Sequence, residues 1–590
     1  MDHRASLQPR LSRRTFLKGA GAGLAALMVG DGVVSFWSSK AFASGKWDYE
    51  ADVVVVGTGG AAFAGAVTAR HHGASVIMIE KAPVVGGTTA KSGGGYWIPN
   101  NFAMRAAGLR DEREDAIRYM ARYSYPQLYH PDAERYGLPE HEYSLIAAFY
   151  DHASVAIDFF AEIGALQSAW AGMVPDYLEH VPENKAPRGR LLFPKGPDGS
   201  PGGGVELIRQ MREWATSHGI EILTNHRARR LVINTDGEIV GLEATNRAGE
   251  TVTFRARRGV VFGTGGFTHN RELVLHFHRG PIYGGCAVPT CEGDFVYIAG
   301  AVGAKLGNMA SAFHAQVVLE QALEFSSTPS DVWQCPGDSM ILVNRYGLRV
   351  TNEKRNYNDR TQIHFVFDPV KAEWPNQLLF MIYDSRCADV YAGNFPFPAP
   401  NTTAPYVLEG QTFEELAAAI QNRLDELATR IGGFQLDESF VTNLKATVER
   451  FNRFAETGVD EDFGRGSYPY DVEWYNQFSE RNPNSTWPDV EKANVTMYPF
   501  QSQGPYYAII LAAGTLDTNG GPMTNANGQV LNTEHVPIPG LYGAGNCIAA
   551  PSANAYWGGG GTLGPALTFG YLAGKHAAQS EVKHVPGEAV

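Results

Sequence analysis

The stretch ADVVVVGTGGAAFAGAVTARHHGASVIMIEKA, residues 51–82, decides the fold. It begins with Val53–Val56, a continuous apolar run typical of a strand that is buried on both faces of a parallel sheet. A glycine-rich turn follows, then a segment that we expect to be helical through Arg70, then a second apolar run over Ser75–Ile79. The order strand, turn, helix, strand predicts an α/β protein with a Rossmann-like domain.

The turn carries the fingerprint of a dinucleotide-binding site. It reads Gly57-x-Gly59-x-x-Ala62, and Glu80 closes the second strand 23 residues after Gly57. The glycines allow a tight turn, the helix N-terminus receives the pyrophosphate, and the carboxylate accepts hydrogen bonds from the ribose. The residues expected to contact the dinucleotide in this segment are Gly57, Gly59, Gly60, Ala61, Ala62, Glu80 and Lys81.

Three further glycine-rich segments indicate that the dinucleotide is FAD. They are VVGGTTAKSGGGYWIPNN (84–101), GVVFGTGGF (259–267) and IPGLYGAGNC (538–547). FAD is larger than NAD, and the protein must also surround its ribityl chain and flavin ring. No histidine lies within 84–95, where flavoproteins of the succinate dehydrogenase type carry their covalent link, so we expect non-covalent FAD. The additional residues expected at the cofactor are Gly87, Thr88, Thr89, Ser92, Gly93, Gly94, Ala228, Thr264, Gly265, Gly545, Asn546, Thr562 and Leu563.

The length of 590 residues predicts more than one domain. Because the glycine-rich strand ends are far apart in the chain, we expect an FAD-binding domain made of two segments, 48–309 and 509–585. Residues 310–508 are rich in aromatic residues and proline, and we expect them to form an inserted α+β cap that holds the substrate. Within this insertion, Thr412 and Glu415 form a capping box before an amphipathic helical pattern.

Composition excludes several classes of function. A net charge of −13 argues against a nucleic-acid partner. The five cysteines form no CxxC or CxxCH motif, which argues against a zinc site, an iron–sulfur cluster or an attached haem. We expect them to be small buried residues, and we expect no metal site.

The N-terminus carries a targeting signal. SRRTFLK (12–18) precedes the apolar GAGLAALMVG (21–30), and AFA (41–43) precedes Ser44. This arrangement resembles a twin-arginine (Tat) export signal with an A-x-A cleavage site. We therefore expect residues 1–43 to be removed and the mature protein to be periplasmic, without a membrane span.

Several motifs outside the fingerprint resemble one flavoprotein family. They are SGGGYWIPNN (92–101), NEKRNY (352–357), RFNRFAETGVDEDFGRG (450–466) and the block IPGLYGAGNCIAAPSANAYWGGGGTLGPALTFGYLAG (538–574). Together they resemble the FAD-dependent fumarate reductase/3-ketosteroid dehydrogenase family, and within it the 3-ketosteroid Δ1-dehydrogenases.

Two positions separate the chemistries of that family. Fumarate reductase-like members carry arginine at the positions of Tyr357 and Tyr556, and a histidine at the position of Asp517, whereas the steroid dehydrogenases carry the two tyrosines. The resemblance therefore favours a ketone over a dicarboxylate as substrate. A small slip in register would instead bring Arg355 or Arg360 to the first position.

The resemblance also implies roles for four residues. Tyr556 and the backbone N–H of Gly560 donate to the ketone oxygen, Tyr357 removes a proton from the neighbouring carbon, and Tyr177 tunes Tyr357. The hydride then goes to flavin N5, which leaves a C=C conjugated to the ketone. Two departures from the family, Trp557 and Gly559, stand where the steroid enzymes usually carry prolines, and they imply an altered pocket wall.

Three functions remain open at this point. The favoured one is a dehydrogenase that acts on an apolar ketone such as a 3-ketosteroid and passes electrons to an unidentified acceptor. The second is an enoate or enone reductase that runs the same half-reaction backwards. The third is a flavoprotein that only carries electrons or binds a ligand, against which the large cap and the two motif tyrosines argue.

Overall fold

The computed structural model describes residues 41–42 and 47–585. Its largest sheet has nine strands, and residues far apart in the chain meet in it. The sheet runs in the order β1-β8-β9-β10-β2-β3-β7, with β19 beside β10 and β18 beside β19. The strands are β1 (Ala41–Phe42), β2 (Tyr49–Val56), β3 (Val76–Ile79), β7 (Glu221–Leu223), β8 (Arg227–Ile233), β9 (Ile239–Thr245), β10 (Thr251–Phe262), β18 (Gln529–Leu531) and β19 (Pro537–Gly543).

The centre of this sheet is parallel, as the sequence predicts. Strand β2 pairs in parallel with β3 and with β10, and the end of β10 pairs in parallel with β19. Val53, Val54 and Val55 are fully buried. Val53 and Val55 belong to a cluster that contains helix residues 61–69 and 563–578, whereas Val54 belongs to a second cluster that contains residues of β8 and β9. The α/β class and the nucleotide-binding sheet assembled from separate segments are confirmed.

Helix α2 (Gly60–His71) follows the glycine-rich turn and packs closely against the C-terminal helix α16 (Leu563–Gln579). Glycine makes the close approach possible, because a Cβ at Gly574 would lie 2.2 Å from the carbonyl oxygen of Gly65. The other helices associated with this part of the chain are α3 (Gly87–Lys91), α4 (Phe102–Ala106), α5 (Arg113–Ser124), α6 (Glu140–Glu162), α7 (Gly204–Ser217), α8 (Arg271–Phe277) and α9 (Asp294–Gly300), with 3₁₀ turns η1 (Glu134–Gly137) and η3 (Gly545–Cys547).

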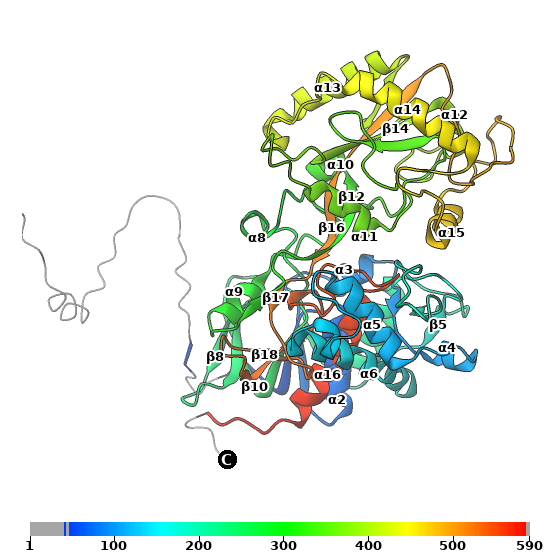
Figure 1. Cartoon of the computed structure of the whole chain (residues 1–590). Coiled ribbons are helices and arrows are strands. Elements are labelled where there is room, and N and C mark those ends of the chain that lie inside the picture. The colour runs from blue at the N-terminus through cyan, green and yellow to red at the C-terminus, as the bar shows by residue number, and fades with distance from the viewer. Residues whose placement is uncertain (1–40, 43–46, 586–590) are drawn as a thin grey trace, which may run out of the picture. The chain divides into compact units, whose positions relative to one another are not determined.

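A second, antiparallel sheet lies in the middle of the chain (Figure 1). It runs β12-β16-β14-β13, with β15 also paired to β16. Its strands are β12 (Ala312–Val318), β13 (Met340–Val343), β14 (Leu378–Asp384), β15 (Val407–Gly410) and β16 (Tyr506–Thr518). The nearby helices are α10 (Leu319–Glu324), α11 (Tyr357–Thr361), α12 (Ser385–Val390), α13 (Phe413–Ile431), α14 (Phe440–Thr457) and α15 (Pro469–Phe478), with the 3₁₀ turn η2 (Gln362–Phe365).

Side chains of this second sheet alternate between two cores, as expected for strands. Phe380 and Ile382 of β14 face a cluster that contains Leu416 of α13 and Phe451 of α14. Met381 and Tyr383 face the opposite cluster. The sheet is therefore covered on both faces.

Two small sheets complete the described chain. One holds β4 (Tyr96–Trp97), β5 (Ser168–Trp170) and β6 (Leu191–Pro194), and the other holds β11 (Leu306–Gly307) and β17 (Gly521–Pro522). Strand β16 (orange in Figure 1) runs through the boundary predicted at 508/509, and the described residues cluster as one compact unit. The division into domains at these boundaries stays a prediction.

Most of the predicted signal peptide lies outside the described residues. Two of its residues are described: Ala41–Phe42 form β1, which pairs in parallel with β8. In residues 41–42 and 47–585, no helix is long and apolar enough to cross a membrane.

Candidate active site

A cavity of about 810 Å³ opens at the carboxyl ends of the parallel strands. The last residues of β2, β3 and β10 line it, as does Ala544 directly after β19, and this edge is where open α/β sheets bind their ligands. Nineteen of the twenty residues expected at the cofactor line the cavity: Gly57, Gly59, Gly60, Ala61, Glu80, Lys81, Gly87, Thr88, Thr89, Ser92, Gly93, Gly94, Ala228, Thr264, Gly265, Gly545, Asn546, Thr562 and Leu563.

Ala62 is the exception. It is fully buried, and a Cβ at Gly263 of the neighbouring strand end would lie 2.6 Å from the amide nitrogen of Ala62. The third position of the fingerprint therefore serves close packing of helix against strand rather than contact with a ligand.

The glycines of the cradle fit an FAD. Gly57 has φ +100° and its Cβ would lie 2.5 Å from Gly263 O, so the turn itself requires glycine. A Cβ at Gly59 would meet no protein atom closer than 3.5 Å, and one at Gly93 would meet none within 4 Å. Because the protein leaves this space open on the cavity side, bare backbone can approach a pyrophosphate at the start of α2.

The carboxylate of Glu80 is held in place for a ribose. Its Oε2 accepts a hydrogen bond from Thr58 Oγ1 at 2.7 Å, and its Oε1 accepts one from the Ala82 amide at 2.8 Å. Each oxygen keeps a lone pair that faces no protein donor in the described chain, so both can accept from hydroxyls. The dinucleotide cradle is therefore complete in the protein itself.

Beyond the cradle, the cavity ends in a cluster of tyrosines. Tyr177 Oη donates to Tyr357 Oη at 2.6 Å, and the ring of Tyr556 stacks on that of Tyr177 with centroids 5.3 Å apart. The Tyr357 and Tyr556 rings meet edge to face at 5.5 Å. The structure thus brings together three residues that lie up to 379 positions apart in the sequence (177 and 556), as the family resemblance implies.

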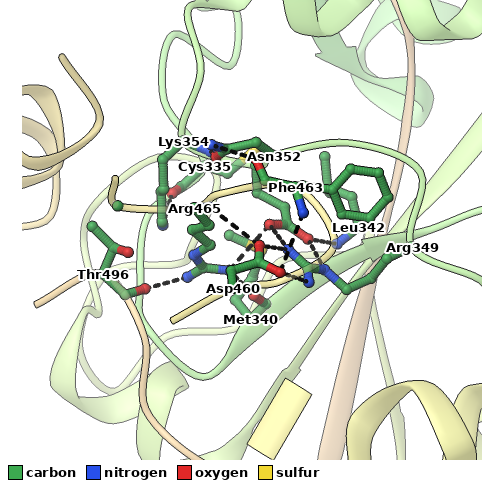
Figure 2. A network of polar contacts seen from close by, with 12 residues as sticks. Cys335, Met340, Leu342, Arg349, Asn352, Lys354, Asp460, Phe463, Arg465 and Thr496 are labelled. Carbon is green, nitrogen blue, oxygen red and sulfur yellow. Dashed lines mark hydrogen bonds and ion pairs between the residues drawn. The ribbon is translucent and has the colours of Figure 1, made fainter. Parts of the chain in front are cut away.

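The segment NEKRNY (352–357) holds Tyr357 at the cavity, because its side chains make separate contacts with the surrounding chain. Asn352 donates to Asp471 at 2.8 Å, and Lys354 donates to the carbonyls of Cys335 and Gly337. Glu353 pairs with Arg349, which also pairs with Asp460 (Figure 2).

The last two residues of this segment start α11. The Asn356 side chain accepts from the Asp359 amide and caps the helix, so that Tyr357 is its first residue. Asn358 bonds both the His314 amide of β12 and the Asn554 carbonyl. These bonds tie the segment of Tyr357 to the segment of Tyr556.

Tyr556 and Gly560 have free hydrogen-bond donors. Thr562 Oγ1 donates to Tyr556 Oη at 3.2 Å, which leaves the phenol proton available for a ligand. Within the described residues, no backbone carbonyl accepts from the Gly560 N–H. Gly560 has φ +86°, and its Cβ would collide with Tyr96 backbone at 2.5 Å, so this position requires glycine.

Burial controls the acidity of the tyrosines. It raises the pKa of Tyr357 well above 10, and the hydrogen bond from Tyr177 acts in the opposite direction. Burial raises the pKa of Tyr556 as well, and the hydroxyl of Thr562 partly offsets this. Both phenols are therefore protonated at neutral pH, which suits Tyr556 as a donor.

The two arginines considered as alternatives do not line the cavity. Arg360 is buried and donates to Gln316 Oε1 and to the carbonyl oxygens of Val332 and Arg355. Arg355 pairs with Asp471 at 3.0 Å. Asp517, at the position of the fumarate reductase histidine, accepts from the Gly266 amide at 2.7 Å, and it is a buried carboxyl rather than a cation.

The sequence did not predict which residues form the far wall of the cavity. Trp333 meets the ring of Tyr357 at 5.0 Å, Trp474 and Phe478 come from α15, and Leu516 comes from β16. The only signal for them was the aromatic content of 310–508. Two of the five free cysteines, Cys286 and Cys291, also line the cavity. Cys286 is partly exposed, contrary to the prediction, whereas the other four are buried.

The two positions that depart from the family, Trp557 and Gly559, lie in different surroundings. Gly559 lines the cavity, where a Cβ would lie 3.2 Å from Leu191. Trp557 is fully buried behind it and stacks with Phe149 at 5.2 Å, while its Nε1 donates to Ser124. Of these two residues, only Gly559 lines the cavity.

The model of the FAD binding domain family matches residues 52–563 of the chain. The chain belongs to the FAD-dependent fumarate reductase/3-ketosteroid dehydrogenase family. It is 30% identical to the 4-oxocyclohexanecarboxylate 2-dehydrogenase of Sinomonas cyclohexanicum, over 91% of this chain and 94% of the relative. It is also 30% identical to a 3-oxosteroid 1-dehydrogenase of Mycobacterium tuberculosis (strain ATCC 25618 / H37Rv), over 90% and 99% of the two chains.

A solved structure supports the fold of this flavoprotein family. The 3-ketosteroid Δ1-dehydrogenase from Sterolibacterium denitrificans superposes with a TM-score of 0.73 at 24% identity, over 90% of this chain and 99% of that one. The protein is thus an FAD-dependent oxidoreductase that acts on carbon–carbon bonds.

Proposed function

We propose that the protein introduces a C=C bond next to the ketone of a cyclic substrate. The observation that carries the proposal is the tyrosine cluster, with Tyr177 bonded to Tyr357 and Tyr556 beside them at the end of the FAD cavity. The wall around it is aromatic and aliphatic, which suits an apolar ring system.

Tyr556 and Gly560 would bind the ketone oxygen. A phenol and a backbone N–H that have no other acceptor form a preorganised pair of donors, and they bind more strongly as the oxygen becomes an enolate. Each such donor contributes about 3 kcal/mol to the stabilisation of a transition state.

Tyr357 would accept the proton from the carbon beside the ketone. The hydrogen bond from Tyr177 stabilises the phenolate form of Tyr357 against the effect of burial. FAD, when bound, supplies the acceptor for the hydride that leaves the adjacent carbon. Loss of a proton and a hydride from neighbouring carbons leaves the C=C.

The positions of the charged residues support a ketone over a dicarboxylate. Neither Arg355 nor Arg360 lines the cavity, so neither is placed to bind the second carboxylate of a dicarboxylate. The reverse reaction, reduction of an enone, uses the same groups, and the electron partner decides its direction. A pure electron carrier would not need the tyrosine cluster.

Two substrate classes remain within this proposal: a 3-ketosteroid and a smaller cyclic ketone that carries a carboxylate. One observation favours the second class. Lys91 lines the cavity, and its Nζ donates to the Thr328 carbonyl at 2.6 Å and to Ser327. In the described residues Lys91 has no carboxylate partner, whereas the other lining lysine, Lys81, pairs with Glu292 and Asp294.

The test is anaerobic mixing of the FAD-loaded protein with two ketones, a 3-ketosteroid and 4-oxocyclohexanecarboxylate. Bleaching of the flavin absorbance by either ketone supports dehydrogenation and identifies the substrate class. If neither ketone bleaches the flavin, but a reduced flavin is reoxidised by fumarate, the proposal is wrong. We also propose Tat-dependent export to the periplasm and non-covalent FAD, on the sequence evidence alone.

A further inference from the structure

Arg355 joins three segments of the chain directly behind the tyrosine cluster. One guanidinium nitrogen donates to Asp471 Oδ1 at 3.0 Å, and the other donates to the backbone carbonyl of Tyr177 at 2.6 Å. The second nitrogen also lies 3.6 Å from Glu179. Arg355 therefore connects the segments that contain Tyr177, Tyr357 and Tyr470.

These contacts hold Tyr177 from both ends. Its hydroxyl bonds Tyr357, its carbonyl bonds Arg355, and its amide donates to the Trp557 carbonyl at 3.3 Å. Because Arg355 lies only two residues before Tyr357, one short segment bonds both the backbone carbonyl of Tyr177, through Arg355, and its hydroxyl, through Tyr357. The distance between the two hydroxyls is thus set by that segment.

The guanidinium is itself fixed. Its side chain is 14% exposed, and it stacks over the rings of Tyr468 at 4.7 Å and Tyr470 at 5.3 Å. Asp471 is fully buried and also accepts from Asn352 and from the Gly466 amide. Two acceptors at different nitrogens require the planar fork of arginine, which a lysine ammonium does not reproduce.

We propose that Arg355 is a positioning residue that sets the contact between the Tyr177 and Tyr357 hydroxyls and thereby controls proton abstraction. The inference rests on the proposed function. It also gives a role to an arginine that does not line the cavity.

The groups that face this unit are tyrosines and acids. Tyr556 and Tyr470 face the Tyr177–Tyr357 pair, while Glu179, Asp471 and the more distant Asp359 face Arg355. The acids pair with Arg355 or bond neutral groups, so none of them replaces the contact to the Tyr177 carbonyl. Loss of this contact should lengthen the hydroxyl pair and weaken the support of Tyr177 for the phenolate.

The matched test compares Arg355→Lys with Arg386→Lys. Arg386 is buried and pairs with the acid Asp338 at 2.7 Å, but it bonds neither the tyrosine cluster nor the segment 352–357. The measurement is single-turnover flavin reduction from about pH 7 to pH 10, with Tm and FAD content for each variant.

We expect Arg355→Lys to be folded and FAD-loaded, with flavin reduction slowed about 10- to 100-fold, substrate affinity within twofold, and the pH–rate curve displaced to higher pH. Arg386→Lys should lower Tm and leave the pH–rate curve in place. Guanidinium ion should restore part of the rate of Arg355→Ala.

A pH–rate curve of Arg355→Lys that superposes on that of the parent overturns the inference, as does a slow Arg355→Ala variant whose rate guanidinium ion does not restore. Tyr357→Phe separates this failure from that of the proposed function. If Tyr357→Phe is inactive while Arg355→Lys is normal, only the inference about Arg355 fails, whereas a normal Tyr357→Phe removes the proposed function itself.

Discussion

Single residues decide the chemistry at this site, and their neighbours decide whether that chemistry works at neutral pH. Tyr357 is a phenol whose pKa is raised by burial, which disfavours the phenolate. The hydrogen bond from Tyr177 is the contact that lowers the pKa of Tyr357. Tyr556, by contrast, is useful only as a protonated donor, so burial helps it.

We expect Tyr357→Phe and Tyr556→Phe to differ. Tyr357→Phe removes the proton acceptor and should slow flavin reduction by about 10²–10⁴-fold, while substrate still perturbs the flavin spectrum. Tyr556→Phe leaves the Gly560 N–H as a donor, so the loss should be about 10²–10³-fold, in rate more than in affinity. Stopped-flow reduction with saturating ketone measures both. Equal rates in parent and Tyr357→Phe would contradict the assignment of the base.

The raised pKa of Tyr357 predicts a rate that increases with pH. A base acts in its deprotonated form, and below its pKa that fraction grows tenfold for each pH unit. Flavin reduction should therefore rise continuously from about pH 7 to pH 10, the ordinary pKa of tyrosine. Tyr177→Phe removes the bond that lowers the pKa, and should reduce the rate throughout this range. A plateau near neutral pH would show that another group is the base.

Strand ends and helix starts fix the positions of the site residues. The first turn of α2 and the glycine-rich segments after β10 and β19 meet at one sheet edge because parallel strands end there together. Helix α11 starts at Tyr357 because Asn356 caps it. The predicted capping box at α13 is partly different, since Thr412 caps Glu415 N but the Glu415 carboxylate accepts from Gln411 N.

We expect the FAD cradle to be sensitive at Gly59 and less sensitive at Glu80. Gly59→Val puts a side chain into space that the protein leaves open for the pyrophosphate, so the purified variant should be colourless. Glu80→Ala removes acceptors for the ribose but keeps the backbone cradle, and should weaken FAD binding without abolishing it. Flavin absorbance per protein and an FAD titration measure the two effects. A fully yellow Gly59→Val protein would refute the cradle.

The packing of α2 on α16 predicts a second glycine effect. Gly574→Ala places a Cβ 2.2 Å from Gly65 O, so the helices must separate, at a cost of about 1–3 kcal/mol. Gly300→Ala is the matched control, because it also lies in a helix and its Cβ would meet nothing within 4 Å. Thermal unfolding should show a lower Tm for Gly574→Ala alone. Equal Tm values would contradict the close approach.

At the scale of the whole molecule, the site depends on distant parts of one chain. The nine-stranded sheet and the antiparallel sheet both contribute to the cavity wall, through Gly57 and Leu516 for example. Such a site forms only when the entire described unit is folded. This is consistent with the Tat system, which we propose as the export route for a protein that carries its FAD already.

Export is tested by replacing Arg13 and Arg14 with lysine. We expect the variant to stay in the cytoplasm with FAD bound, while the parent is recovered from the periplasm with a new N-terminus near Ser44. Cell fractionation and N-terminal sequencing measure this. Export that is indifferent to both arginines, or a periplasmic form that begins at Met1, would exclude the Tat route.

The sequence by itself determined the nucleotide-binding half of the fold and the identity of the cofactor. These are local properties, because Gly57, Gly59 and Glu80 lie within one strand–helix–strand unit and each has a fixed geometric task there. It also named the tyrosines that we propose to be catalytic, but only through resemblance to a family, since nothing in the spacing of Tyr177, Tyr357 and Tyr556 places them together.

Only the tertiary structure decided the rest. It placed Ala62 in the packing between helix and strand, carried β16 through the predicted boundary at 508/509, and brought Trp333 and Trp474 to the cavity wall. It also separated Arg355 and Arg360 from the cavity. The physical reason is that burial, side-chain direction and the partners of a charge arise from contacts between segments hundreds of residues apart, which no local pattern encodes.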